Sequence, residues 1–181
     1  MIEIIWHGRG GQGSFTGSRL LGLSASLFEN KFAMAFPTFG PERRGAPVLG
    51  FTKIDSKHIT DRSEIQKSDY SIILDETLID SNIENELKDS GVLIINSKYP
   101  EKYKFISKVK TVFIDANTIA NKILGKQIVN TAMLGAFVAV SNVISIESAI
   151  LGISHDMKSN IVEKNIELLI SAYSFSLKLS Q

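Results

Sequence analysis

The 181-residue sequence contains no cysteine. This absence excludes disulfides, a thiolate nucleophile and iron–sulfur clusters ligated by cysteine. Histidine is scarce as well: His7, His58 and His155 fall in separate segments without the spacing of metal ligands. We expect each histidine to fill the core or the surface. His7 is the best candidate for another role, because it ends a predicted strand beside a glycine-rich loop.

An excess of charge of one sign and a long apolar run are also missing. The 20 Lys and Arg residues nearly balance the 19 Asp and Glu residues and form no clustered excess, so no basic patch predicts nucleic-acid binding. The longest apolar run, Ala132–Val140, is far shorter than the ~20 residues that span a bilayer. The N-terminus lacks the features of a signal peptide. We therefore expect a soluble cytoplasmic protein without nucleic-acid or membrane partners.

With 44% apolar residues, the chain is long enough to bury a substantial core. It contains no repeat, no low-complexity tract and no internal linker. The sequence therefore predicts a single domain over residues 1–181.

The most informative segment is a glycine-rich loop between a predicted strand, Ile2–Trp6, and a predicted helix, Ser14–Phe28. Four glycines within six residues leave little side-chain bulk, and glycine adopts dihedral angles that other residues avoid. Such a loop can direct several N–H groups at an anion or at a partner backbone. Its candidate binding residues are Gly8, Arg9, Gly10, Gly11, Gln12 and Gly13.

A second candidate segment, Phe32–Pro47, is rich in proline and phenylalanine and is predicted to be a long functional loop. Its adjacent Arg43 and Arg44 suit a clamp for a phosphate or carboxylate group. They also suit a subunit interface, where arginine and aromatic residues are enriched. The interface is the favoured interpretation.

Further along, apolar strands alternate with helices. Asp115 is predicted to cap a helix that runs to Leu124. Strands that are apolar on both faces and separated by helices indicate a parallel sheet covered on two sides. The remaining predicted elements of this region are strands at Val48–Ile54, Tyr70–Leu74, Val92–Ile95 and Thr111–Ile114, and a helix at Leu78–Lys88.

The C-terminal region is predicted to be helical. A helix over Ala132–Val143, capped by Asn130 or Thr131, is apolar all round and should be buried. The final helix, about residues 160–179, carries two apolar stripes, so either it docks on a partner subunit or it is deeply buried. The predicted fold class is α/β: a three-layer Rossmann-like domain with a mostly parallel sheet and a helical C-terminus.

Ligands of open parallel sheets gather beyond the carboxyl ends of the strands, where Asp75 and Asp115 should lie. Both aspartates occupy positions where a turn or a helix cap favours them. No nucleophile–base pair, carboxylate dyad or metal-ligand cluster is apparent, so we expect no catalytic residue in this chain.

Gly8, Gly10 and Gly13 satisfy the G-x-G-x-x-G spacing of dinucleotide-binding loops. Such loops are followed about twenty residues later by an acidic residue that holds the ribose, and residues 31–37 contain none. The Gly-Lys-Ser/Thr ending of a nucleotide-binding P-loop is also absent. Both cofactor interpretations are therefore disfavoured.

Two further blocks, Asn130–Gly135 and the pair Lys164–Asn165, follow the two loops. In order and spacing, the four blocks resemble the gamma subunit of the 2-oxoacid:ferredoxin oxidoreductases. The form of Glu42–Val48 is most similar to family members that act on pyruvate and branched-chain oxoacids.

The resemblance implies a subunit of a complex that decarboxylates a 2-oxoacid on thiamine diphosphate, passes electrons through iron–sulfur clusters to ferredoxin and transfers the acyl group to coenzyme A. The family carries thiamine diphosphate on its alpha and beta subunits and clusters on its beta and delta subunits, so this chain should bind no cofactor alone. Its implied role is assembly and shaping of the coenzyme A approach, with coenzyme A phosphates as the leading anion for the two loops. The alternatives are a stand-alone dinucleotide-binding oxidoreductase and a ligand-free scaffold.

Overall fold

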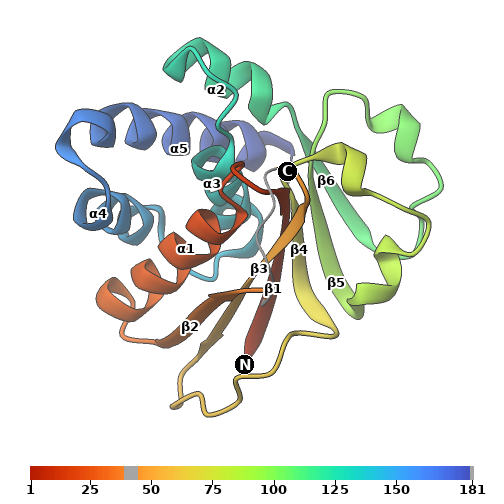
Figure 1. Cartoon of the computed structure of the whole chain (residues 1–181), viewed down its shortest axis with the longest axis horizontal. Helices are drawn as coiled ribbons and strands as arrows, with labels where there is room; N and C mark the ends of the chain where they lie inside the picture. The colour runs from red at the N-terminus through yellow and green to blue at the C-terminus, as the bar shows by residue number, and fades with distance from the viewer. Residues whose placement is uncertain (39–44, 180–181) are drawn as a thin grey trace.

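The computed structural model describes residues 1–38 and 45–179. Within these ranges, six strands form one sheet in the order β2-β3-β1-β4-β5-β6 (Figure 1). The pairings β1–β4, β4–β5 and β5–β6 are parallel, whereas β1–β3 and β2–β3 are antiparallel. The sheet is thus mostly parallel, as predicted. The strands are β1 (Ile2–Arg9), β2 (Phe32–Pro37), β3 (Pro47–Asp55), β4 (Ser68–Ile73), β5 (Leu87–Asn96) and β6 (Lys110–Ile114).

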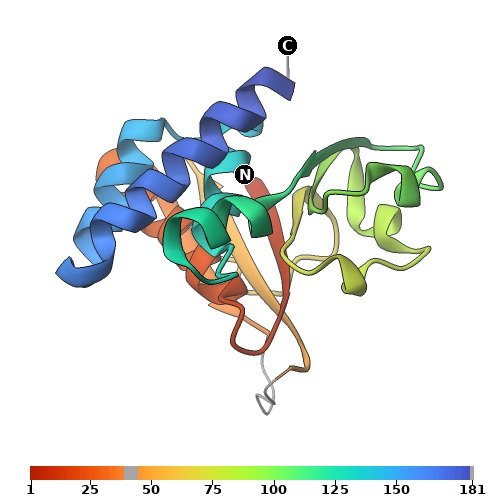
Figure 2. The same ribbon diagram turned by 90° about the horizontal axis from the view of Figure 1, so that it is seen from above.

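The α-helices of the described chain pack against one face of the sheet (Figure 2). Apolar residues of β1 such as Trp6 meet this helical layer, and the Trp6 and Phe137 rings lie 6.4 Å apart between centroids. The central helix is α3, where ten of twelve residues are buried, which confirms the predicted buried helix. The helices are α1 (Ser14–Phe28), α2 (Ala116–Leu124), α3 (Asn130–Ser141), α4 (Ile146–Asp156) and α5 (Ser159–Leu179).

The opposite face of the sheet is covered by loops and by the short 3-10 turns η1 (Glu76–Leu78), η2 (Ile83–Glu86) and η3 (Pro100–Tyr103). The chain therefore has three layers, but α-helices do not form the third. The predicted helix over Leu78–Lys88 is wrong. Short polar side chains provide the physical reason: Asp80 accepts a hydrogen bond from the backbone N–H of Asn82, two residues on, and such local bonds compete with a helix.

The predicted loop over Phe32–Pro47 begins instead with the edge strand β2, which pairs with β3 along its whole length. The proline that argued for a loop, Pro37, is the last residue of this edge strand, where a missing N–H is tolerated. Residues 39–44 lie outside the described residues.

The caps at the helix ends agree only in part with those predicted from the sequence. As predicted, the Asp115 side chain caps α2, accepting a hydrogen bond from Thr118 N at 3.0 Å, and the helix ends at Leu124, where Gly125 follows in the left-handed region. Asn130 and Thr131 do not cap α3. They are its first two residues, and the N-cap position is occupied by Val129, which has no capping side chain.

The two apolar stripes predicted on α5 do not divide into a core face and a partner face. Leu168 and Ala172, both of the second stripe, are fully buried in the chain's own core. The exposed apolar residues of that stripe, Ile161, Phe175 and Leu179, lie toward the two ends of the helix. No helix within the described ranges combines the length and the apolar content needed to cross a membrane.

Candidate functional site

The glycine loop, residues 8–13, leaves the carboxyl end of β1 and enters α1. Gly11 and Gly13 have φ angles of +94° and +83°, which side chains rarely allow. A Cβ atom on Gly13 would also lie 2.8 Å from the amide Nδ2 of Asn130, so α3 of the same chain approaches the loop closely. At Gly11 a Cβ would meet no atom within 4 Å, so this glycine faces open space.

Most of the loop's donors are satisfied within the chain. The N–H of Arg9 donates to Gln12 Oε1 at 2.7 Å, and the N–H of Gln12 donates to the Arg9 carbonyl at 2.9 Å. The N–H of Gly10 donates to the carbonyl of Ala46 at 2.8 Å. An anion cradle needs N–H groups that are free to point at the ligand. The loop is therefore a closed turn rather than an open cradle of backbone N–H groups.

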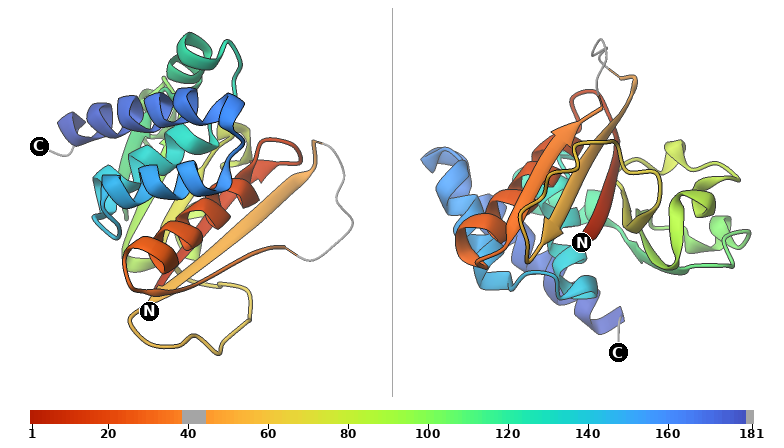
Figure 3. Two further views of the ribbon diagram at one scale, coloured as in Figure 1. Left: turned by 90° about the vertical axis from the view of Figure 1, so that its left-hand side faces the viewer. Right: turned by 90° about the horizontal axis from the view of Figure 1, so that it is seen from below.

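The Arg9 side chain connects three segments. Its Nε donates to Asp75 Oδ2 at 3.1 Å, its Nη2 to the Thr77 hydroxyl at 2.8 Å and its Nη1 to the carbonyl of Gly45 at 3.1 Å. Gln12 Nε2 donates to the same Asp75 oxygen at 2.8 Å. The guanidinium thus holds the loop against the end of β4 and the start of β3, as Figure 3 shows for the backbone.

Asp75 lies at the carboxyl end of the parallel strands, and its hydrogen-bond partners could not be predicted from the sequence. Burial would raise the pKa of its carboxyl group, but hydrogen bonds from Thr77 and Gln12 and the charge of Arg9 outweigh burial and lower the pKa. The carboxylate also accepts from Thr77 N, so the predicted turn role is correct but incomplete. The one sequence feature that pointed to these contacts was its position just after β4, the parallel neighbour of β1.

This arrangement also weighs against dinucleotide binding. The segment expected to supply the ribose-binding acid, residues 31–37, contains β2 at the far edge of the sheet. The acid that does end the strand beside β1 is Asp75, and it is occupied by Arg9 and Gln12. The stand-alone dinucleotide-binding alternative is not favoured.

Arg43 and Arg44 lie outside the described residues. The residues that follow them are nonetheless tied to the glycine loop: Gly45 N donates to the Gly10 carbonyl at 3.3 Å, and Ala46 accepts from Gly10 N. The base of the arginine segment and the glycine loop thus form one continuous surface, here called the loop surface (residues 8–13 and 45–46).

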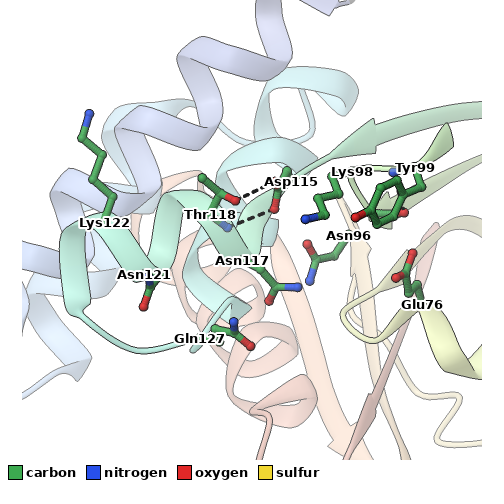
Figure 4. A pocket seen from close by; sticks show the side chains of 11 residues that line it. Glu76, Asn96, Lys98, Tyr99, Asp115, Asn117, Thr118, Asn121, Lys122 and Gln127 are labelled. Carbon is green, nitrogen blue, oxygen red and sulfur yellow. Dashed lines mark hydrogen bonds between the residues drawn. The ribbon is translucent and has the colours of Figure 1, made fainter.

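A polar hollow of about 370 Å³ lies beside the carboxyl ends of β5 and β6 (Figure 4). Its buried Asn96 donates to the Leu74 carbonyl and accepts from Ala116 N, so both ends of its amide join neighbouring segments. The phenol of Tyr103 donates to Glu76, and burial together with that carboxylate raises the Tyr103 pKa to about 12. Groups of three or more His, Cys, Asp or Glu side chains that suit a metal ion are absent from the described residues.

His7, the histidine singled out in the sequence, is nearly buried on the face opposite the helices. Its Nε2 lies 2.7 Å from Glu86 Oε1, and the Ser71 hydroxyl donates to the same carboxylate oxygen. Since histidine and serine both bind the carboxylate, the imidazole is not placed to deprotonate Ser71. This cluster ties η2 to the sheet. The other two histidines pack edge-on against phenylalanine rings.

The third and fourth sequence blocks meet where α3 packs on α5. The Thr131 hydroxyl donates to Asn165 Oδ1 at 2.9 Å, and Asn165 Nδ2 donates to the Ile161 carbonyl at 2.8 Å. A Cβ on Gly135 would lie 2.3 Å from the Leu169 carbonyl oxygen. Close packing of two helix backbones therefore accounts for this glycine.

Comparison with known proteins supports the family resemblance that these sequence blocks indicated. Residues 3–175 match the family model described as pyruvate ferredoxin/flavodoxin oxidoreductase. The chain is 46% identical over 179 residues to the pyruvate synthase subunit PorC of Methanocaldococcus jannaschii, covering 98% of each chain. It is 40% identical over 179 residues to the pyruvate/ketoisovalerate oxidoreductases common subunit gamma of Pyrococcus furiosus, covering 96% of each.

Among solved structures, the pyruvate oxidoreductase subunit PORC of Thermotoga maritima superposes with a TM-score of 0.82 at 30% identity, covering 96% of this chain and 95% of that one. The chain therefore belongs to the pyruvate ferredoxin/flavodoxin oxidoreductase family, as a gamma subunit of a multi-subunit oxidoreductase.

Proposed function

We propose that this chain serves a complex that converts pyruvate, or the related branched-chain acid 2-oxoisovalerate, and coenzyme A to acyl-CoA and CO2 while reducing ferredoxin. The observation that carries the proposal is the 46% identity to a pyruvate synthase subunit, which extends over nearly the whole of both chains. A location in the cytoplasm and organisation as one domain over residues 1–181 belong to the same proposal.

The partners of the proposed complex are its alpha, beta and delta subunits. Thiamine diphosphate is expected on alpha and beta, and iron–sulfur clusters on beta and delta. The cysteine-free sequence supports this division, because protein-bound clusters are held chiefly by cysteine thiolates. The gamma chain then contributes to assembly and to the approach of coenzyme A rather than to a bond-breaking step.

The choice of 2-oxoacid belongs, in this proposal, to the partner subunits. A relative 40% identical to this chain is named as the gamma subunit common to pyruvate and ketoisovalerate oxidoreductases in Pyrococcus furiosus. A gamma chain of this kind is compatible with either acid. Specificity is therefore expected where the acid is bound, on another chain.

The loop surface is the proposed contact with a neighbouring subunit. Its glycine at position 11 faces open space, and most of its donors are already satisfied, so it offers a preformed backbone shape. Arg43 and Arg44 adjoin this surface in sequence. They are proposed to contact either the neighbouring subunit or the phosphates of coenzyme A.

Co-expression with the three partner subunits tests the proposal. The complex should co-purify and should reduce ferredoxin only when pyruvate and coenzyme A are both present. The proposal is refuted if the tagged chain does not retain the partner subunits. It is also refuted if the other three subunits assemble and remain active without this chain.

The role of the arginines is tested in the same complex. Arg43→Ala or Arg44→Ala should raise the KM for coenzyme A about 10-fold or more if a phosphate is held there, because a charge-assisted hydrogen bond contributes roughly 1.5–3 kcal/mol. Arg62→Ala, which changes an exposed arginine between β3 and β4, is the control. An unchanged KM with weaker subunit association would establish the interface instead.

A further inference from the structure

The strand β6 forms one edge of the sheet. In the described chain it pairs with β5 alone, in parallel. The carbonyl of Ile114 accepts from Ser97 N, so the backbone N–H and C=O groups of Ile114 face β5, and those of alternate residues along the strand do the same. The N–H and C=O groups of Thr111 and Phe113 therefore point toward the open edge. An edge of this kind is a ready template for pairing with another strand.

A groove of about 490 Å³ lies beside this edge, between β6 and the C-terminal end of α5. Phe175 and Leu179 of α5 form its apolar wall, and these side chains are 45% and 53% exposed. Figure 2 shows that this end of α5 extends beyond the other helices. The groove thus places exposed apolar side chains beside the outward-facing backbone groups of β6.

A local excess of lysine borders the groove, contrary to the expectation, drawn from the whole sequence, that basic residues form no clustered excess. Residues 98–110 contain five lysines and one acidic residue, Glu101. All five lysines are exposed, and none forms an ion pair with a described residue. Lys98 and Lys110 belong to the groove lining, whose one acidic residue, Asp115, uses its carboxylate to cap α2. The border of the groove is therefore positively charged.

Aromatic rings hold this basic segment in place against the sheet. The Tyr103 ring stacks on the Phe113 ring of β6 with the centroids 5.8 Å apart. The ammonium groups of Lys98 and Lys102 lie 4.9 and 4.2 Å from the centroid of the exposed Tyr99 ring. Such contacts orient the lysine side chains and keep their charge available to an anionic partner.

The charge of the groove decides between possible occupants. Pairing of β6 with a second copy of itself would bring together the Lys110 side chains and the lysine-rich segments of both copies, and like charges on adjacent strands repel. An extended segment with acidic side chains carries the opposite charge. Its backbone can pair with Thr111 and Phe113, and its alternate apolar side chains can pack on Phe175 and Leu179.

We propose that β6 and the end of α5 bind an extended acidic segment of a partner protein, which adds a strand to the sheet beside β6. Alternate side chains of the segment are apolar and pack on Phe175 and Leu179, and those between them are acidic and meet the lysines of residues 98–110. If the proposed function holds, the segment belongs to a neighbouring subunit. That identification rests on the proposed function, whereas strand addition does not. The contact is separate from the loop surface, which contributes no residue to the groove lining.

Binding of synthetic peptides to the full-length chain, measured by fluorescence anisotropy, tests this proposal. The probe is a heptapeptide of alternating glutamate and valine, and the matched control peptide has lysine in place of glutamate. The acidic peptide should bind at least about 10-fold more tightly than the basic one at low salt, and its affinity should fall as salt screens the exposed charges. N-methylation of alternate residues, which removes backbone donors from the acidic peptide, should weaken its binding at least about 10-fold, because strand addition depends on main-chain hydrogen bonds.

Thr111→Pro tests the backbone contact from the side of the chain. The substitution removes an N–H group that points away from β5, and proline is tolerated on edge strands. It should weaken binding of the acidic peptide at least about 10-fold while leaving the melting temperature nearly unchanged. Lys110→Glu should weaken binding by a similar factor. Lys57→Glu, which changes an exposed lysine just after β3, is the matched control and should leave the affinity unchanged.

Hydrogen exchange gives a second readout that needs no variant. In the free chain, the N–H groups of Thr111 and Phe113 should exchange at least about 10-fold faster than those of Val112 and Ile114, which face β5. Exchange at Thr111 and Phe113 should slow when the acidic peptide binds and when the chain assembles with its partner subunits.

The proposal is overturned if the acidic peptide does not bind at about 1 mM, or if N-methylation or Thr111→Pro leaves its affinity unchanged. It is also overturned if the N–H groups of Thr111 and Phe113 become protected by self-association of the chain alone, which would assign the edge to a second copy. Unchanged exchange at these two residues in an active complex would exclude a neighbouring subunit as the source of the segment while leaving the proposed function in place. Loss of assembly or of ferredoxin reduction by the wild-type complex would instead overturn the proposed function alone.

Discussion

Arg9 and Asp75 are 66 positions apart in the sequence, and their side chains meet at 3.1 Å between Nε and Oδ2. The pair joins the carboxyl ends of the adjacent parallel strands β1 and β4. Gln12 binds the same carboxylate oxygen, so one aspartate holds the glycine loop at two of its residues. The loop surface therefore has a fixed shape before any partner arrives.

Asp75→Asn should lower the free energy of unfolding by about 1–3 kcal/mol at neutral pH, because hydrogen bonds to a charged group are lost. The pKa of Asp75 is lowered from its ordinary 3.8 in the folded chain, so its contribution is complete above that pH and fades as the pH falls through the folded pKa. The difference from wild type should thus be larger at about pH 6 than at about pH 3 in urea titrations, and should shrink further as the pH falls.

Asp89→Asn, an exposed aspartate, should show no such pH-dependent difference. If the Asp75 variant differed from wild type equally at both pH values, the ionised carboxylate would not be what holds the loop.

Gly135→Ala should destabilise the chain by about 3 kcal/mol, because the added methyl group would lie 2.3 Å from a backbone oxygen of α5 that cannot move aside alone. Gly22→Ala is the matched case within a helix, since its Cβ would meet side chains alone, the nearest being that of Ala35 on the edge strand at 3.3 Å. Its effect should stay within about 1 kcal/mol, because helix propensity favours alanine. Equal melting temperatures for the two variants would contradict close backbone packing at Gly135.

Lys53 is a buried lysine whose ammonium group pairs with an exposed carboxylate. Its side chain is 1% exposed, and its Nζ lies 2.6 Å from the carboxylate of Asp61, which is 51% exposed. Asp61→Ala leaves the buried ammonium without its partner, whereas Lys53→Met removes the charge and keeps the apolar stem. Urea midpoints should therefore fall further for Asp61→Ala than for Lys53→Met. Adding Asp61→Ala to the Lys53→Met chain should lower the urea midpoint little further. If the effects of the two substitutions on the midpoint were additive, the two side chains would not be coupled.

The two apolar residues Leu168 and Phe175 on α5 should behave differently, because the first is fully buried and the second is 45% exposed. Leu168→Ser should cost at least about 2–5 kcal/mol of folding free energy, as large-to-small core substitutions do. Phe175→Ser should leave the melting temperature nearly unchanged and weaken retention of the partner subunits in co-purification. Normal assembly by the folded Phe175 variant would show that this end of α5 faces solvent in the complex.

Local pattern was sufficient for some elements. The helix at Ser14–Phe28 was predicted with its observed bounds, and Asp115 was correctly predicted as a helix cap. These features depend on residues within one or two turns of each other. The helix predicted at Leu78–Lys88 failed because apolar spacing was weighed without the Asp side chains that bind nearby N–H groups. The strand β2 was missed because its pairing with β3 is not visible in its own residues.

By itself, the sequence determined the family, the absence of cysteine chemistry and the position of the glycine loop, because motifs and composition are properties of the chain order. Only the tertiary structure decided what that loop does with its donors. Gln12, Ala46 and Asp75 occupy them, and two of these three, Ala46 just before β3 and Asp75 just after β4, are distant from the loop in sequence. Whether a polar group is satisfied depends on which distant groups the packed chain brings within about 3 Å, and no local pattern contains that information.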